Sequence, residues 1–153
     1  MERDPERTGV LAVCEELGIG FVLWGPVGMG CLAGTMDARA RLDPETDPRA
    51  GLDRFSPGNL AADRPIIDRL ARFADERDAT PAQVSLARLL ALKPWIVPIP
   101  GTRDPARLGE SPGSARVRLT ADEPRETDGA VSRVGVHGGR MNEEQTRVVD
   151  RTA

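Results

Sequence analysis

The residues best placed to do chemistry lie around one Pro-Gly turn. The apolar, β-branched run Ile96–Ile99 predicts a buried strand, and Pro100-Gly101 ends it. The segment 101–111 then opens a short helix and carries two arginines. Free backbone amides at such a turn, together with guanidinium groups, can bind phosphate. The pattern therefore indicates a site for a phosphate-bearing ligand. Arginines on an ordinary solvated surface would produce the same sequence pattern.

A second apolar run leads into a glycine-rich loop. The run Ile19–Trp24 is apolar on both faces, which is typical of a strand buried on both sides in a parallel sheet. The loop Gly25–Gly30 follows it directly. Taken alone, the loop is equally consistent with a plain strand-to-helix turn, and Trp24 with a core tryptophan.

Helix signals surround both strands. A helix start at Asp4-Pro5-Glu6 is followed by apolar residues at helical spacing until Gly18. Further helices are predicted over 65–77, from the capping sequence Thr80–Gln83 to Pro94, and from Asp104 to about Glu110. Helices that alternate with buried strands predict an α/β fold with right-handed crossovers.

Two stretches show little periodicity. Residues 33–63 are rich in Gly, Pro, Asp and Arg, and a loop of that length is usually functional or disordered. Thr120 resembles an N-cap, but Pro124 and the polar residues after it leave little to bury. We therefore predict a folded part over 1–125 and a polar, poorly ordered tail over 126–153.

Composition excludes several classes of function. A chain of 153 residues can form one domain, and its net charge of −3 argues against nucleic acid as a partner. The absence of Tyr removes one class of catalytic acid. Cys14, Cys31 and the lone His137 do not form a zinc motif, so no metal is expected. Cys14 is predicted to be a buried, reduced thiol, and His137 to be exposed and idle.

The N-terminus has no signal-peptide pattern, and no apolar run approaches the length of a membrane span. We therefore expect a cytoplasmic protein with no membrane partner.

Taken in order, the segments resemble the C-terminal half of an aldo-keto reductase. The resemblance covers roughly residues 3–125 and rests on the following matches: Arg3–Glu6, Cys14–Val22, Gly25–Gly30, Arg54-Phe55, Asn59-Leu60, Ala79–Gln83 with Ala87, and Ile96–Arg103. It implies an α/β fold that is a partial (β/α)8 TIM barrel, comprising the last two βα units and the helices around them. A complete barrel needs about 250 residues. Members of the family are NADPH-dependent oxidoreductases that interconvert carbonyls and alcohols by hydride transfer.

The resemblance also implies two cofactor-binding loops. Trp24 would stack on the nicotinamide, and the loop after it would lie along the pyrophosphate, where glycines allow close approach. The segment after the last strand would hold the 2′-phosphate and the adenine. The implied cofactor residues are Trp24, Gly25, Val27, Gly28, Met29, Gly101, Thr102, Arg103, Arg107, Glu110 and Ser111.

Several positions depart from the family pattern and weaken the expected binding. Gly25 stands where a serine is usual, Met29 where an arginine is frequent, and Ser111 where an asparagine is usual. The charge of Asp104 opposes a phosphate. The resemblance therefore implies weak or vestigial NADPH binding.

The family's catalytic Tyr, Lys, Asp and His belong to the N-terminal half, so no catalytic residue is assigned here. The single lysine, Lys93, lies before a strand. We expect a family member that is inactive alone. Two alternatives stay open: a structural half-barrel subunit that completes a separately encoded N-terminal half or self-associates, and a truncated product without function. Leu23, Val97 and Ile99 would be exposed in such a half-barrel, and Phe55 could have lined a substrate pocket.

Overall fold

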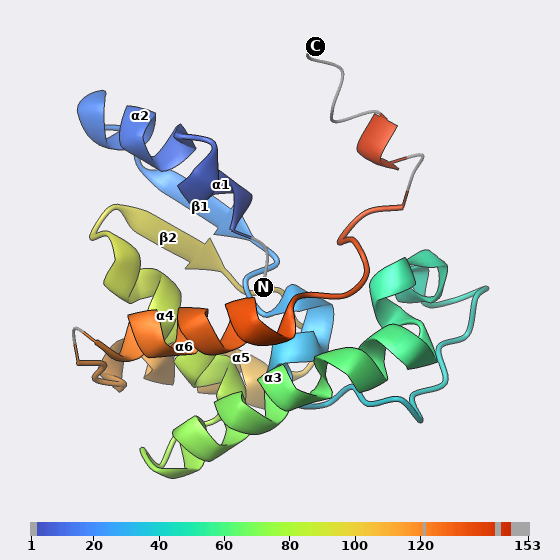
Figure 1. The fold of residues 1–153 in the computed structure, drawn as a ribbon. Helices are drawn as coiled ribbons and strands as arrows, with labels where there is room; N and C mark the ends of the chain where they lie inside the picture. The colour runs from blue at the N-terminus through green and yellow to red at the C-terminus, as the bar shows by residue number, and fades with distance from the viewer. Residues whose placement is uncertain (1–2, 121, 143–144, 148–153) are drawn as a thin grey trace.

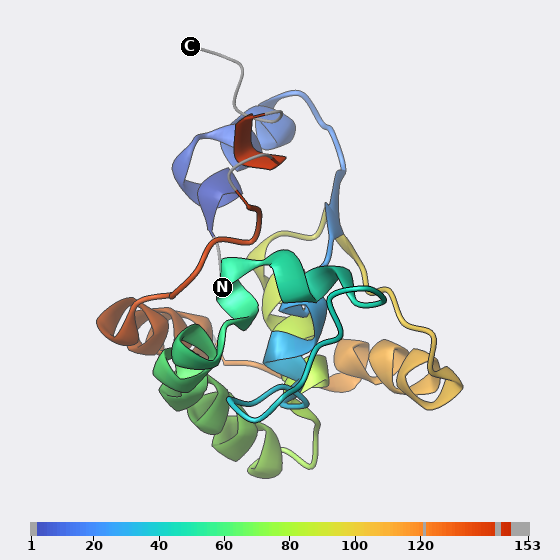
Figure 2. The ribbon, with the colours of Figure 1, turned by 90° about the vertical axis from the view of Figure 1, so that its right-hand side faces the viewer.

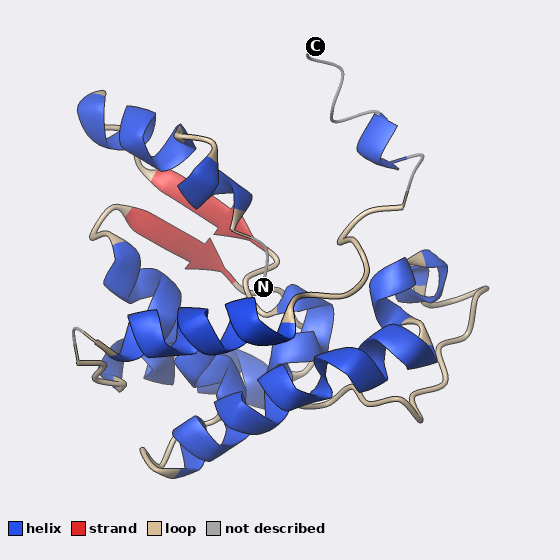
Figure 3. Ribbon diagram, in the orientation of Figure 1, coloured by secondary structure: helices blue, strands red, loops and turns tan. Residues whose placement is uncertain are grey.

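The computed structural model describes residues 3–120, 122–142 and 145–147. In this part of the chain, two parallel strands, β1 (Phe21–Trp24) and β2 (Ile96–Ile99), form a two-stranded sheet. Phe21 pairs with Ile96 and Trp24 with Ile99, so the strands run side by side along their full length (Figures 1 and 3). The predicted mixed α/β character and parallel pairing are confirmed.

The crossover between the strands consists of α3 (Pro57–Asp75) and α4 (Pro81–Leu92), and α4 packs against both α3 and β2. The helix predicted to start at Pro65 begins earlier, at Pro57. Ser56 caps it by accepting a hydrogen bond from the Asn59 amide at 3.3 Å. Pro65 is inside the helix, where it donates no backbone hydrogen bond.

The start of α4 agrees with the sequence prediction. Thr80 Oγ1 accepts a hydrogen bond from the Gln83 amide at 3.2 Å, and Gln83 Oε1 accepts one from the Thr80 amide at 3.0 Å. This reciprocal capping box satisfies two amides that the helix itself leaves unpaired. The Thr80 hydroxyl also donates to the Glu110 carboxylate, which joins the start of α4 to the end of α5 (Pro105–Glu110).

The N-terminal helix is divided, contrary to prediction. Gly9, at a φ of +82°, separates α1 (Asp4–Arg7) from α2 (Val10–Glu16). No residue of α2 is buried, and Cys14 is half-buried instead of buried. The apolar stripe of α2 therefore lacks the packing partner that the prediction assumed.

The stretch 33–63 contributes to the core. It contains the short helices η2 (Pro48–Gly51) and η3 (Asp53–Phe55). A third short helix, η1 (Gly28–Ala33), ends at the first residue of this stretch. A buried cluster joins these turns to α3: Cys31, Met36, Leu52, Phe55 and Leu60. Phe55 is 6% exposed, so it packs in this cluster instead of lining a substrate pocket.

Helix α6 (Glu123–Val134) spans the predicted boundary between 125 and 126. Ion pairs hold it. Asp128 pairs with Arg88 of α4 at 2.6 Å and with Arg3 at 3.1 Å, and Glu123 pairs with Arg77. These ion pairs join α6 to α3, α4 and the N-terminal segment, which the sequence pattern did not predict. Residues 143–144 and 148–153 of the predicted tail lie outside the described residues. Figure 2 shows α6 on one side of the molecule and α5, followed by η4 (Ser111–Arg116), on the other.

One face of the sheet is open, so the strands are not buried on both sides as predicted. Val22, Trp24, Val97 and Ile99 are each 50–59% exposed. Leu23 was expected on this face but is half-buried, because side chains alternate along a strand and its register partner is Pro98, not Val97. These four exposed residues are termed the open sheet face.

Among the described residues, no helix has the length and apolar character needed to cross a bilayer.

The capping box yields a stability prediction. Thr80→Ala removes the acceptor for the Gln83 amide and the hydroxyl that donates to Glu110, and should lower the free energy of unfolding by about 1–2 kcal/mol. Urea denaturation followed by circular dichroism measures the change. Thr80→Ser keeps the hydroxyl and should retain most of the stability, and equal losses in both variants would contradict the capping role.

Candidate functional site

The predicted cofactor loops lie at the same edge of the sheet. Because β1 and β2 are parallel, the segments that follow them, Gly25–Met29 and Gly101–Arg103, both leave from the carboxyl ends of the strands. Trp24 and Ile99, the last strand residues, are register partners. The structure therefore brings together two loops that are far apart in sequence.

The glycine-rich loop has an unusual backbone. Gly25, Gly28 and Gly30 have φ values of +61°, +60° and +100°, which favour glycine, and Met29 adopts +53° despite its side chain. The Gly28 amide donates to the Gly25 carbonyl at 3.0 Å and the Gly30 amide to the Val27 carbonyl at 3.2 Å. These two amides are engaged within the turn, so a phosphate could use them only after the turn opens.

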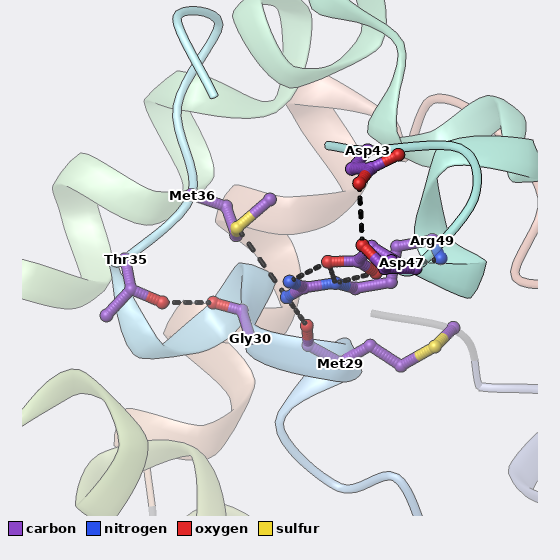
Figure 4. Close-up of polar contacts among 8 residues, drawn as sticks. Met29, Gly30, Thr35, Met36, Asp43, Asp47 and Arg49 are labelled. Atoms are coloured by element: carbon purple, nitrogen blue, oxygen red, sulfur yellow. Dashed lines mark hydrogen bonds and ion pairs between the residues drawn. The ribbon is translucent and has the colours of Figure 1, made fainter. Parts of the chain in front are cut away.

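Arg49, from η2, holds this loop in place (Figure 4). Its Nη1 donates to the Met29 carbonyl at 3.0 Å and lies 3.7 Å from the Met36 sulfur. Asp47 orients the guanidinium by accepting from its Nε at 2.9 Å and its Nη2 at 2.6 Å. Sequence reasoning missed Arg49, because an arginine in an aperiodic stretch carries no signal of its partner.

The Asp47 carboxyl, which orients Arg49, is held in its ionised form. Its pKa is lowered from 3.8 to about 2, first by the side-chain hydrogen bond from Arg49, then by the Arg49 amide and by the charges of Arg49 and Arg103. The charge of Arg103 acts on Asp47 even though the residues follow different strands. Near the two loops, the Asp47 carboxylate is therefore paired with Arg49 and also lies in the field of Arg103.

The segment after β2 is exposed, and several of its polar groups form hydrogen bonds with one another. Asp104 caps α5 by accepting from the Ala106 amide at 2.9 Å, and it lies 3.5 Å from Arg107 Nε. Thr102 Oγ1 accepts from the Asp104 amide at 3.1 Å. A carboxylate thus occupies the helix start that a phosphate would need, and one of the two predicted arginines is turned toward it.

The two predicted adenine residues are already hydrogen-bonded within the protein. Glu110 accepts from Thr80 through its side chain and from Gln83 Nε2 through its carbonyl, at 3.0 Å. Ser111 Oγ donates to the Arg107 carbonyl at 2.9 Å. Both side chains are half-buried and engaged within the protein. They contribute packing and helix termination before any ligand contact.

Trp24 is exposed and partly covered by a residue that sequence reasoning missed. Its side chain projects from the open sheet face, and the guanidinium carbon of Arg140 lies 4.5 Å from the centre of its ring. This is a cation–π geometry. Arg140 comes from the predicted tail, where nothing in the sequence pairs it with a tryptophan 116 positions earlier.

His137 contacts Asp63 of α3, a structural role that the prediction of an exposed and idle histidine did not include. Its backbone amide donates to Asp63 Oδ1 at 3.0 Å, and its Nδ1 lies 2.9 Å from the same oxygen. Asp63 lies on α3 and its side chain is 3% exposed. The nearby Cys31 thiol has a raised pKa, caused mainly by burial. Among the described residues, no three His, Cys, Asp or Glu side chains gather as a metal-binding group.

The lone lysine lies at the opposite end of the sheet. Lys93 precedes β2, and its Nζ is 2.6 Å from Glu15 of α2. It is therefore remote from the carboxyl ends of the strands, where Trp24 and the two loops lie. Since the sequence also has no tyrosine, the two loops have neither a lysine nor a tyrosine beside them as a proton donor.

A cavity of about 270 Å³ lies along β1 and reaches this edge. Its apolar wall includes Phe21, Leu70, Val84 and Val131, and Trp24, Met29 and Arg140 also line it.

Comparisons with known proteins agree on one family. The model of the Aldo/keto reductase family matches residues 1–132. The chain is 35% identical over 138 residues to probable aldo-keto reductase 1 of Glycine max, covering 90% of this chain and 39% of that protein. It is 31% identical over 140 residues to the aldo-keto reductase yakc [NADP(+)] of Schizosaccharomyces pombe, covering 92% of this chain and 41% of that one.

A solved structure is also similar in fold. The glycerol dehydrogenase AKR11B4 from Gluconobacter oxydans superposes with a TM-score of 0.72 at 21% identity, over 86% of this chain and 39% of that chain. The chain thus spans about two fifths of the length of these proteins.

The Arg49 contact yields a dynamic prediction. Arg49→Ala removes the donor to the Met29 carbonyl, so amide hydrogen exchange over 28–36 should speed up about tenfold, as expected for loss of a charge-assisted hydrogen bond. Mass spectrometry of the exchanged peptides measures it. Arg41→Ala, an exposed arginine in the same stretch, serves as control and should leave the exchange rates unchanged.

The Asp47 pKa fixes the pH range of this contact. Since the folded value, about 2, lies below the ordinary 3.8, the contribution of the Asp47–Arg49 pair is complete above pH 3.8 and is lost as the pH falls through 2. The exchange protection over 28–36 should therefore persist at pH 3.8. Its loss near pH 5 would contradict this assignment.

Proposed function

The chain belongs to the aldo/keto reductase family, and on that premise we propose that it forms the C-terminal part of the family's (β/α)8 barrel and binds NADPH weakly. In this proposal β1 and β2 are the last two strands, and the helices around them belong to the outer layer of the barrel. Hydride transfer by this chain alone is not part of the proposal.

The observation that carries the proposal is the common edge of the two loops. In parallel α/β folds, ligands bind beyond the carboxyl ends of the strands, and both predicted loops leave from there. The printed name of the Schizosaccharomyces pombe relative includes NADP(+). Trp24, which is 57% exposed, supplies an aromatic ring on which a nicotinamide would stack, and Arg103 supplies an exposed guanidinium for a 2′-phosphate.

Three contacts make weak affinity the expected outcome. Asp104 occupies the start of α5 and draws Arg107 toward itself. The Gly28 and Gly30 amides are engaged within their own turn. A bound phosphate must therefore displace existing hydrogen bonds, and the cost of that displacement is subtracted from the binding free energy.

The same reasoning leaves hydride transfer without a proton donor. A bound reduced nicotinamide would supply hydride chemistry, and the carbonyl oxygen of a substrate would need a proton from a residue of the protein. The chain has no tyrosine, and its single lysine is paired with Glu15 at the far end of β2. The residues present can bind and orient a dinucleotide, but none of those assigned to the site can protonate the substrate at neutral pH.

NADPH binding gives a direct test. At a concentration about tenfold above its Kd, NADPH should stabilise the fold by about 1.4 kcal/mol and raise the Tm by about 3–5 °C. Arg103→Ala removes the charge-assisted contact to the 2′-phosphate and should weaken NADPH binding about tenfold, to the level of NADH. Differential scanning fluorimetry measures both.

The matched control is Arg118→Ala, which removes one exposed arginine outside the proposed site. It should keep the NADPH response. An unchanged Tm with millimolar NADPH for the unmodified chain would overturn the proposed function.

A second candidate follows from the open sheet face. Four apolar side chains are at least half exposed, and in the described residues each strand pairs on one edge only. Exposed edges and apolar faces of this kind normally pair with another element. The alternative function is therefore a structural subunit that completes the barrel with a separately encoded N-terminal half.

Size-exclusion chromatography with light scattering tests this alternative. The chain alone should self-associate, and a co-expressed N-terminal half with the family's Tyr, Lys, Asp and His should convert it to a defined complex. Val97→Asp should reduce the association, whereas Leu108→Asp, an exposed apolar position on α5, should not. A monodisperse monomer that ignores the N-terminal half would rule the alternative out.

A further inference from the structure

The segment 135–142 connects α6 to the site edge and makes contacts at three successive points. After α6 ends at Val134, the chain meets α3 through His137, the stretch before α3 through Gly138, and the end of β1 through Arg140. These contacts join residues far apart in sequence. The segment 135–142 is called the strap below.

The first contact is polar and joins a buried carboxylate, Asp63, to a more exposed residue, His137. Asp63 on α3 accepts from the His137 amide at 3.0 Å, and His137 Nδ1 lies 2.9 Å from the same oxygen. A buried carboxylate needs such partners, because leaving it without them costs more than an ordinary hydrogen bond gains. Asp63 therefore fixes where the strap crosses α3.

The second contact is a close backbone approach. Gly138 lies at a φ of +71°, and its carbonyl accepts from Arg54 Nη2 at 3.3 Å. A Cβ built on Gly138 would lie 2.4 Å from Arg54 Cα and 2.5 Å from its nitrogen. Only glycine fits here, because the positive φ disfavours other residues and because a Cβ would clash with the Arg54 backbone. The strap thus lies directly against the chain at this point.

The third contact covers the aromatic side chain of the site. The Arg140 guanidinium carbon is 4.5 Å from the centre of the Trp24 ring, a distance at which the planar cation and the indole face attract each other. Trp24 stays 57% exposed, so the contact covers the ring only in part.

We propose that the strap is an autoinhibitory element, in which Arg140 occupies the face of Trp24 that a nicotinamide ring needs. The proposal rests on the proposed function, because it assigns that stacking role to Trp24. Two planar groups cannot share one face of an indole, so Arg140 must leave before a ring can stack. Its withdrawal leaves the anchors at Asp63 and Arg54 in place, which makes the covered state reversible.

The test compares the full chain with Arg140→Ala by two readouts. Acrylamide quenching of tryptophan fluorescence reports access to Trp24, and since Trp95 is present in both proteins, the difference reports the Arg140 contact. Quenching should increase, and the Kd for NADPH should fall about two- to fivefold, the factor set by an exposed cation–π contact. Arg72→Ala, an exposed arginine on α3, is the matched control and should change neither readout.

Gly138→Ala provides a second variant with a different physical cause. Its Cβ would displace the strap through the clash with Arg54, so quenching should again increase and NADPH should bind more tightly. Circular dichroism of both variants establishes that the fold is retained.

The outcomes separate the two proposals. Unchanged quenching in Arg140→Ala overturns the strap, as does weaker NADPH binding, which would make Arg140 a support for the ring instead of a competitor. If no variant binds NADPH, the proposed function fails, whereas increased quenching in both variants still supports the strap as a cover for Trp24.

Discussion

The parallel pairing of β1 with β2 is the constraint on which the rest of the structure depends. Parallel neighbours cannot be joined by a tight turn, so the chain must return along α3 and α4 before it re-enters the sheet. That return path places Thr80, the cap of α4, beside α5, and it brings both glycine-containing loops to one edge. Antiparallel pairing would have put the two loops at opposite ends.

Much of the fold was predictable because its signals are local. The capping box at Thr80 and Gln83, the strand before Pro100 and the parallel arrangement depend on neighbouring residues or on simple periodicity. The two wrong helix boundaries have a local cause as well. A glycine such as Gly9 or a proline such as Pro65 can mark a helix boundary or lie inside a helix, and the residue type alone does not say which. For α3, the cap at Ser56 shows that the helix begins before Pro65.

The contacts that sequence reasoning missed are long-range and polar. Arg49 with Met29, His137 with Asp63 and Arg140 with Trp24 are separated by 20, 74 and 116 positions, and no periodic pattern links them. Composition alone made the residues after Pro124 appear unable to fold, yet Asp128 is fixed by two arginines. The cofactor residues were named through a family resemblance, but which of them are already engaged within the protein only the geometry reveals.

The ion pair between Lys93 and Glu15 bears on which part of the molecule unfolds first. Helix α2 buries no residue. This ion pair joins the helix to Lys93, which precedes β2, and its side chains are 38% and 54% exposed. Exposed pairs of this kind contribute little and are screened at physiological ionic strength. Helix α2 is thus expected to open before α3 and α4, which carry the buried side chains of the core.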